Sequence, residues 1–558
     1  MSHSNNILRN IWISAILIYP LLFIWQCGDL TDTGFLAFNY SNFSNSLTTG
    51  TFNSETLITN FSGFYWMSFF PGYEILSLKF LFILLTYLSL FFSFQILKKF
   101  SQNTNLLLLS LFMGELLFVR YTSFIFSKDI MSWSLILASL ACITKEKNEK
   151  LFLFIGGGII LLATFSRLPN ILLIPLYSLF IYLESNKYEY TFYQIIKKRL
   201  FFLFSGFLGG FILFNLLLWN SSILDDFYHN FNLVKKTVSE DSSSYSLSQL
   251  LKIYIKETIV FLKLAFVFIS SMILLSWVSS RAEKHLFKVI FILGTLLFII
   301  GNFYYYFGYN YSSKFKYLPA IFCLPPLIWA LFKNKKWSFF ILLILSLSFL
   351  QVFGSNTGLF LKSSFSMTLL IPMTVIILIN NENFLQWNIS LNNKIYLNVS
   401  LITLSLISIT SRIGGVYHVT EGIDARLSCT YPIKTSKMYG LYTTKERKEH
   451  IEMMQKAIHE NCPQSRTVFI YGHQPLFYFL TDTYPPEGIA WLKNKVVSKN
   501  LVFKQLNKEI KTQEILVVDT KEKIFGDEGE AELRQFLQEY NFRKVSETST
   551  FVIWRMNN

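Results

Sequence analysis

A long succession of apolar runs dominates the sequence and constrains the fold more than any other feature. Each run is near the length that a helix needs to cross about 30 Å of hydrocarbon. The runs cover residues 11–25, 80–97, 105–120, 130–144, 151–165, 170–183, 200–219, 259–278, 286–303, 317–332, 338–353, 364–380 and 395–411. This pattern predicts an α-helical polytopic membrane protein with about 13 transmembrane helices.

The composition agrees with this prediction. Hydrophobic residues make up 52% of the chain and charged residues only 15%, whereas a soluble protein carries about 25% charged residues. The net charge is +15, and in a membrane protein such an excess of Lys and Arg belongs mainly to cytoplasmic loops. Because no basic patch is concentrated on a soluble segment, we expect no nucleic-acid partner.

The positions of the basic residues predict the orientation. Arg9 precedes the first run, and the next Lys or Arg is Lys79, so the N-terminus should be cytoplasmic. The first run lacks a small-residue cleavage site and is interpreted as a retained helix. Basic clusters fall on alternate connections, at residues 98–99, 145–150, 197–199, 281–288 and 333–336, while connection 381–394 fits less well. We expect a multi-pass protein of the bacterial inner membrane, with its C-terminus periplasmic.

The last part of the sequence has a different composition. Residues 1–411 are predicted to form the transmembrane domain, and residues 412–558 a small periplasmic α/β domain. Helical stretches at 446–461 and 530–540 alternate there with strand-like runs at 467–471, 514–518 and 550–554, as in an α/β fold. Cys429 and Cys462 can form a disulfide if this domain is periplasmic, but spacing alone does not fix the pairing.

Two carboxylates follow the first apolar run in a segment without basic residues. Asp29 and Asp32 lie in the sequence Gly28-Asp29-Leu30-Thr31-Asp32-Thr33-Gly34-Phe35. One interpretation is a polar turn that caps a helix, since Asp, Thr and Gly favour such places. The other is a general base at the mouth of an outward-facing cavity.

Further charged residues stand at predicted outer helix ends. Asp129 immediately precedes the run 130–144. An acid at this position either interacts favourably with the helix dipole or belongs to a functional site. Glu115 and Arg120 form either a structural pair or part of a substrate site. Arg167, in a turn between two short runs, either snorkels to the interface or points into a vestibule.

Two cations in a later outer segment run against the positive-inside rule. Lys314 and Lys316 follow a Tyr-rich loop and precede Tyr317, Leu318 and Pro319. A bound phosphate would explain them, because Lys interacts with phosphate as a point charge. Lysines within an interfacial aromatic belt are the alternative explanation.

In layout and in three short motifs, the sequence resembles the GT-C class of integral-membrane glycosyltransferases, namely bacterial relatives of aminoarabinose transferase and protein O-mannosyltransferase. Asp32-Thr33-Gly34-Phe35 resembles the Asp-Glu-x-Tyr type motif after the first helix. Asp129 resembles the acid of the second outer loop. Lys314-Phe315-Lys316-Tyr317-Leu318-Pro319, with Pro325-Pro326, resembles the basic-x-basic-Tyr-Leu-x-Pro entry to a late helix. Thr33 departs from the family pattern, which has a second acid there.

The resemblance implies transfer of a sugar from a polyprenyl-phosphate donor to an acceptor hydroxyl at the periplasmic face. Phosphate leaves as a stable anion and needs cationic stabilisation rather than a general acid. This role falls to Lys314, Lys316 and Arg167, with Tyr317 beside them. The acceptor is a lipid, glycan or protein, and a single displacement at the anomeric carbon implies inversion.

A carboxylate base is expected to activate the acceptor hydroxyl. Asp32 is assigned this role, although the departure at Thr33 leaves Asp29 as an alternative, and Asp129 is expected to orient the reacting groups. The resemblance implies no definite cofactor, because relatives differ in whether they need a divalent cation; Asp29, Asp32 and Asp129 can together bind one. Membrane lipids are the other expected partners.

Two other functions are compatible with the sequence. A polymerase or ligase acting on lipid-linked polysaccharides would share the substrate class and the face of the membrane. A transporter or flippase would show internal symmetry and ionisable groups near mid-membrane, whereas the notable charges here gather at the outer boundary. A catalytically inactive scaffold with a partner-binding outer domain is a third alternative.

Overall fold

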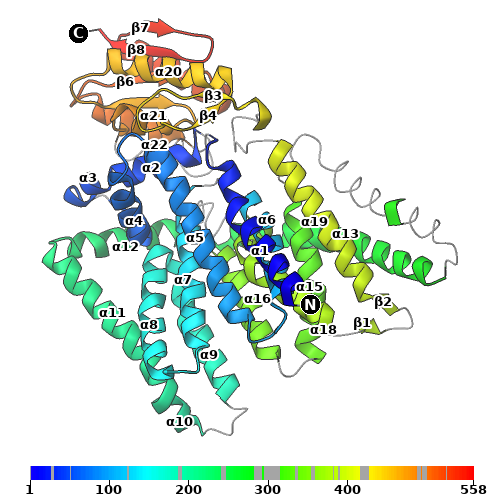
Figure 1. The fold of residues 1–558 in the computed structure, drawn as a ribbon. Coiled ribbons are helices and arrows are strands. Elements are labelled where there is room, and N and C mark those ends of the chain that lie inside the picture. Colours follow the sequence, from blue (N-terminus) through cyan, green and yellow to red (C-terminus); the bar gives the residue numbers. More distant parts are fainter. Residues whose placement is uncertain are drawn as a thin grey trace.

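The computed structural model is a bundle of helices with a small sheet-containing part at one end (Figure 1). It describes residues 2–26, 30–50, 52–121, 125–185, 191–239, 247–281, 292–294, 315–333, 337–353, 358–380, 383–386, 390–414, 426–486, 492, 499–522 and 525–557. The helices before the sheet are α1 (Ser2–Ile18), α2 (Asp32–Ser41), α3 (Phe43–Thr48), α4 (Leu57–Ser68), α5 (Glu74–Leu97), α6 (Thr104–Tyr121), α7 (Lys128–Ile143), α8 (Glu149–Ser166), α9 (Leu173–Ser185), α10 (Phe192–Ile195), α11 (Phe201–Asn220), α12 (Leu224–Ser239), α13 (Leu247–Arg281), α15 (Leu318–Lys333), α16 (Ser338–Val352), α17 (Leu359–Lys362), α18 (Met367–Asn380) and α19 (Asn393–Gly414).

The helical membrane character predicted from the sequence is supported. Within the described residues, seven helical segments are long and apolar enough to cross a membrane: 6–23, 74–97, 149–166, 168–185, 193–220, 248–275 and 363–380. Four shorter apolar helices cover 104–117, 318–333, 338–352 and 396–406. The predicted run 286–303 lies almost entirely outside the described residues, so the count of 13 stays a prediction.

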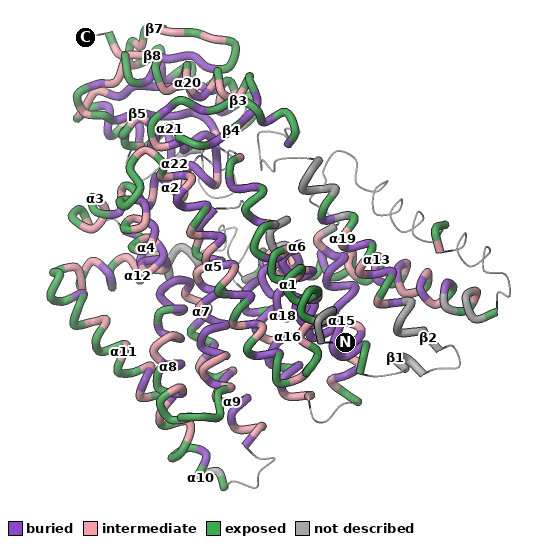
Figure 2. The backbone as a smooth tube through the Cα atoms, viewed as in Figure 1, coloured by how far each residue is buried: buried purple, intermediate pink, exposed green. Residues whose placement is uncertain are grey.

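Burial differs sharply among these helices (Figure 2). Helix α18 is buried along most of its length and packs against α6 and α15. Helix α11 instead exposes large apolar side chains, with Leu213 and Leu217 each more than half exposed. An apolar face of this kind is unfavourable in water and stable against lipid, so the outer helices agree with a membrane environment.

The C-terminal part (residues 426–557) is built on a four-stranded sheet of order β5-β6-β8-β7. Strands β5 (Val468–Tyr471) and β6 (Leu516–Asp519) are parallel, and β8 (Val552–Met556) is antiparallel to both β6 and β7 (Phe542–Glu547). The accompanying helices are α20 (Lys445–Asn461), α21 (Leu476–Thr481), α22 (Lys499–Glu509) and α23 (Gly526–Glu539), beside the short pair β3 (Tyr431–Pro432) and β4 (Tyr442–Thr443). Each of the two helical and three strand-like stretches predicted here overlaps an observed element, namely α20, α23, β5, β6 and β8, whereas α21, α22 and β7 were not predicted.

Both faces of this sheet are covered. Val468 and Ile470 belong to the main core, whereas Phe469 and Tyr471 belong to a second core that includes Leu533 of α23. Because alternate residues of a strand point to opposite faces, burial on both faces explains why β5 is a continuous apolar run. No disulfide joins Cys429 to Cys462, so the pairing that the sequence allowed is not formed.

The C-terminal part rests on the ends of α2 and α5. The Leu476 amide donates to the Leu30 carbonyl at 3.1 Å, and the Tyr439 amide donates to the Gly72 carbonyl at 3.2 Å. A Cβ atom on Gly34 would lie 2.2 Å from the Leu476 nitrogen, so only glycine permits this close approach. The helix bundle therefore has two distinct ends: one contacts the C-terminal part, and the other lies away from it.

Candidate functional site

A compact group of charged side chains lies at the bundle end that faces the C-terminal part. Asp129 is in the first turn of α7 and is 6% exposed. Its two carboxylate oxygens interact with different cations: Oδ1 lies 3.7 Å from Arg167 Nε, and Oδ2 pairs with Lys362 Nζ. A buried carboxylate is stable only when paired in this way.

Arg167 is held in place by backbone carbonyls as well as by Asp129. It ends α8 in an extended conformation, and Leu168 and Pro169 then begin a 3-10 turn. Its guanidinium donates to the Leu350 carbonyl at 3.0 Å and to the Phe353 carbonyl at 2.9 Å. Arg167 therefore fastens the end of α16 to the Asp129 carboxylate rather than snorkelling to solvent.

Hydrogen bonds behind Asp129 fix the start of α7. Asn170 Nδ2 donates to Ser132 Oγ at 2.7 Å, and Trp133 Nε1 donates to Thr368 Oγ1 at 3.1 Å. Both Ser132 and Trp133 lie one helical turn beyond Asp129, and both are fully buried. These contacts tie α7 to the turn after α8 and to α18, so the Asp129 carboxylate has a defined position.

A second ion pair lies nearby, between Lys316 and Glu257. The Lys316 ammonium pairs with Oε1 of Glu257 on α13, and both side chains are largely buried. The other oxygen, Oε2, accepts the backbone amide of Leu359. Gly358 precedes this amide with φ +94°, and a Cβ there would lie 2.2 Å from Glu257 Oε1. Glu257 can approach this turn only because residue 358 is glycine.

Helix α17 joins the two charged groups within four residues. The Leu359 amide meets Glu257, the Phe360 ring packs on Tyr317 at 4.8 Å between centroids, and Lys362 meets Asp129. The Lys316 ammonium also lies 5.3 Å from the Tyr317 ring centroid. The structure thus brings together four of the residues predicted from the sequence: Asp129, Arg167, Lys316 and Tyr317.

Asp32 occupies a different place. It is the first residue of α2, at the end of that helix that contacts Leu476 through Gly34. The far end of α2 reaches the charged group, where Tyr40 donates to the Phe126 carbonyl at 3.1 Å. Eight residues of helix separate Asp32 from Tyr40, or roughly 12 Å along the axis. Asp29 and Lys314, the other two predicted residues, lie outside the described residues, as does the side chain of Arg120.

Lys362 and Glu257 were missed by the sequence reasoning. Lys362 lies in a connection predicted to be outside, so it is an exception to the positive-inside rule, as Lys316 is. It could have been recognised from the sequence for the same reason. Glu257 precedes the run 259–278 by two residues and had no feature to separate it from an ordinary helix-end acid. Glu55 adds another negative charge close enough to act on Arg167.

A metal site is not apparent in the described part of the chain, where no three His, Cys, Asp or Glu side chains are close enough together to hold an ion. Asp129 is already engaged by two cations, which disfavours a further divalent cation at that carboxylate.

Comparison with known proteins adds no assignment: no protein-family model matches the sequence, and no curated protein is significantly similar to it.

Proposed function

We propose that this chain is a membrane glycosyltransferase that takes sugar from a polyprenyl-phosphate donor, at the membrane face that bears the C-terminal part. The observation that carries this proposal is the convergence of Arg167, Lys316 and Lys362 beside the α17 turn. Three cations at one end of apolar helices suit a lipid-linked phosphate, which presents its charge at that depth.

The cations have different parts in this proposal. Arg167 is held by Asp129 and by two backbone carbonyls, and Lys362 is held by Asp129, so both cations have fixed positions. Lys316 is bound by Glu257 alone among the acids of the described residues, and it can exchange that carboxylate for a donor phosphate. As the bond to the anomeric carbon breaks, the leaving phosphate gains negative charge and Lys316 stabilises it.

The acceptor side of the reaction is assigned to Asp32. A carboxylate base takes the proton of the acceptor hydroxyl while its oxygen attacks the anomeric carbon from the face opposite to the phosphate, which inverts that carbon. Asp32 begins α2 at the contact with the C-terminal part, roughly 12 Å of helix from the charged group. An acceptor held between the two parts would reach Asp32, and the acceptor and the donor sugar together have to span the distance to the cations. The acceptor is a lipid, glycan or protein hydroxyl, and the expected location is the bacterial inner membrane with residues 426–557 periplasmic.

The test uses purified protein in lipid nanodiscs with polyprenyl phosphate and a panel of labelled polyprenyl-phosphate sugars. Wild-type protein should bind polyprenyl phosphate and release it from one of the sugar donors. Lys316→Met should weaken this binding about tenfold, the loss of one charge-assisted contact. Lys333→Met is the matched control, because Lys333 is exposed at the opposite end of the adjoining helix α15. Equal binding by both variants would remove Lys316 from the donor site.

A second variant separates base catalysis from binding. Asp32→Asn should abolish sugar transfer while polyprenyl-phosphate binding stays at the wild-type level, because the carboxylate acts on the acceptor. An Asp32→Asn protein with near-normal turnover would exclude Asp32 as the base. A polysaccharide polymerase or ligase would give the same donor binding but would form products with more than one added repeat unit.

A transporter is the second candidate function, and Glu115 is the observation that favours it. This residue lies within α6 and is fully buried, and neither carboxylate oxygen has a hydrogen-bond partner among the described residues. Buried acids inside membrane helices often carry protons in transporters. Proton-driven uptake into vesicles that Glu115→Gln abolishes, without any sugar donor, would support transport over glycosyl transfer.

A further inference from the structure

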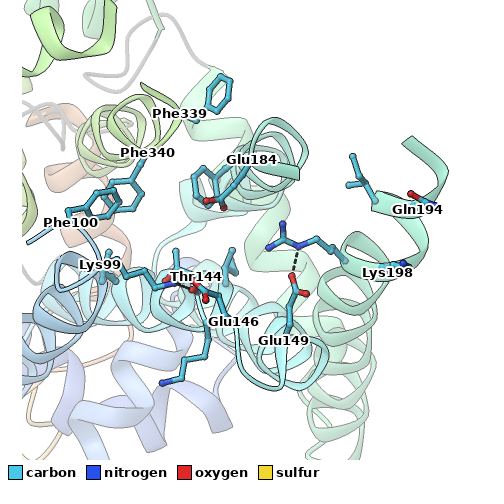
Figure 3. Close-up of a pocket in the computed structure, with 16 residues that line it drawn as sticks. Lys99, Phe100, Thr144, Glu146, Glu149, Glu184, Gln194, Lys198, Phe339 and Phe340 are labelled. Atoms are coloured by element: carbon cyan, nitrogen blue, oxygen red, sulfur yellow. Dashed lines mark hydrogen bonds and ion pairs between the residues drawn. The ribbon is translucent and has the colours of Figure 1, made fainter. Parts of the chain in front are cut away.

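A cavity of about 360 Å³ lies at the bundle end away from the C-terminal part. It is bordered by the end of α5, the end of α7 and the start of α8, with α9 and the start of α16 around them (Figure 3). None of its lining residues belongs to the charged group around Asp129. Because α7 begins at that group and ends at the cavity, the two sites lie at opposite ends of the membrane-spanning helices.

The basic connections that fixed the predicted orientation meet at this cavity. Lys99, Lys145 and Lys198 come from three different connections and all line it. By the positive-inside rule this is the cytoplasmic end. Since the cavity lies where apolar helices end, its depth is that of the lipid headgroups.

One wall of the cavity is aromatic. Phe100 and Phe340 stack with their ring centroids 4.4 Å apart, and Phe180 packs against Phe340 at 6.3 Å. All three line the cavity. A ligand here therefore meets an apolar surface on one side and charged groups on the other, as an amphiphile does.

The charges in the cavity are of both signs. Arg199 pairs with Glu149 and donates to Ser185 Oγ at 2.8 Å. Lys99 pairs with Glu146 at 3.3 Å, but that Glu146 side chain is 92% exposed, so the pair is weak. Lys99 also donates to the Thr144 carbonyl. Because an ammonium has three N–H donors, an incoming phosphate can replace Glu146 on Lys99 while the bond to Thr144 is kept.

Glu184 also lines the cavity and takes no part in the contacts described above. Its side chain points toward the cavity (Figure 3) and is half-buried. Glu184 forms no hydrogen bond or ion pair within the part of the chain that the structure describes. A half-buried carboxylate without a partner favours a cation beside it, and a primary ammonium satisfies it with both charge and hydrogen bonds.

We propose that this cavity binds the headgroup of an aminophospholipid, of which phosphatidylethanolamine is the simplest. The lipid phosphate contacts Lys99 and Arg199, and its ammonium donates to Glu184. The glycerol end and the first acyl carbons lie along Phe100 and Phe340. The proposal does not depend on the proposed function, because the two sites share no residue.

Other lipids fit this chemistry less well. Phosphatidylglycerol carries the phosphate but no cation for Glu184. Phosphatidylcholine carries a cation, but its quaternary nitrogen has no N–H to donate. The charge pattern therefore predicts a preference for a primary amine, which distinguishes this cavity from a general anionic-lipid site of Lys and Arg alone.

The test is lipid retention measured by native mass spectrometry on the full-length protein in detergent. Wild-type protein mixed with equal amounts of the three lipids should retain phosphatidylethanolamine about fivefold better than the others, the effect of one partly buried ion pair. Glu184→Gln should remove this preference, and Lys99→Met should lower retention of phosphatidylethanolamine and phosphatidylglycerol alike. Lys98→Met, which removes a neighbouring lysine that does not line the cavity, should change neither.

Three results would overturn the proposal. Equal retention of the three lipids by wild-type protein would do so, and this comparison needs no variant. An unchanged preference in Glu184→Gln would exclude the ammonium contact. Equally strong binding of soluble glycerophosphoethanolamine would show that the cavity holds a free phosphoethanolamine ligand and not a lipid.

Discussion

The Lys362 ammonium pairs with the Asp129 carboxylate, although 233 positions separate the two residues in the sequence. Lys362 ends the four-residue helix α17, and Asp129 lies in the first turn of α7. With Arg167 on the other carboxylate oxygen, the pair links α7, α17 and the end of α8. The charged group therefore holds these helix ends together.

Replacing Asp129 by Asn should destabilise the protein strongly. The change leaves the buried Arg167 and the largely buried Lys362 without their acid, and removal of one partner from a buried pair costs about 3–5 kcal/mol. Asp482→Asn is the matched control, because Asp482 pairs with Lys437 but its side chain is 67% exposed, and exposed pairs contribute at most about 1 kcal/mol. Thermal unfolding in detergent measures both; similar shifts would show that Asp129 is not structurally critical.

Gly358→Ala should lower the unfolding temperature and release Lys316 from Glu257. Residue 358 has φ +94°, and an added Cβ would lie 2.2 Å from Glu257 Oε1. Gly526→Ala isolates the backbone effect, because Gly526 has φ +68° and open space around it. Positive φ alone costs about 1 kcal/mol, so the Gly358 variant should lose clearly more. Equal losses would mean that the Glu257 contact contributes nothing.

The sequence predicted the helical membrane character well because apolar length and charge placement are local properties. It also pointed to Asp129, Arg167, Lys316 and Tyr317, since a charge at an outer helix end is visible without any knowledge of packing. Which charge meets which could not be predicted. The pairing of Lys316 with Glu257 depends on the α17 turn, whose glycine conformation and position are set by tertiary contacts.

The segment after the first helix also depends on tertiary contacts that the sequence alone does not predict. The sequence shows no apolar run between the first two predicted membrane helices, whereas the structure has α2, α3 and α4 between residues 32 and 68. These helices are short and their apolar residues do not form a long run, so no hydrophobic period marked them. The position of Asp32, at the contact with Leu476, follows from the packing of Gly34 on the C-terminal part and could not be predicted from its neighbours.

Acid should destabilise the C-terminal part through His450. Burial lowers the pKa of this imidazole below its ordinary value of 6.5; the nearby Arg447 lowers it too, while the Gln474 hydrogen bond and the Glu522 charge oppose the shift. The folded state therefore holds His450 neutral, with Nε2 donating to Gln474 Oε1 at 2.8 Å. As the pH is lowered below 6.5, His450 takes up a proton in the unfolded chain before it does so in the folded protein. The free energy of unfolding therefore decreases as the pH decreases, until the folded imidazole is protonated as well.

The His450 contribution can be separated from other acid effects. The unfolding temperature of the C-terminal part is measured from pH 8 to 5.5 for wild-type protein, His450→Gln and His459→Gln. His459 lies on the same helix and is exposed. The His450 variant should lose part of the acid sensitivity, whereas the His459 variant should keep it. Identical pH profiles for all three proteins would assign the acid sensitivity to other groups.

Arg167→Lys should weaken the site although it keeps the positive charge. The planar guanidinium of Arg167 donates to the Leu350 and Phe353 carbonyls while its Nε faces Asp129. A lysine ammonium is a single point and cannot serve three partners in a fixed plane, so at least one buried carbonyl loses its hydrogen bond. The expected loss of stability is about 1–3 kcal/mol. Lys362→Arg is the matched control, because it also keeps the charge. Lys362 forms a single ion pair, with Asp129, so this exchange should be tolerated better. If unfolding temperatures fall equally for the two exchanges, the geometry of Arg167 is not what secures the end of α16.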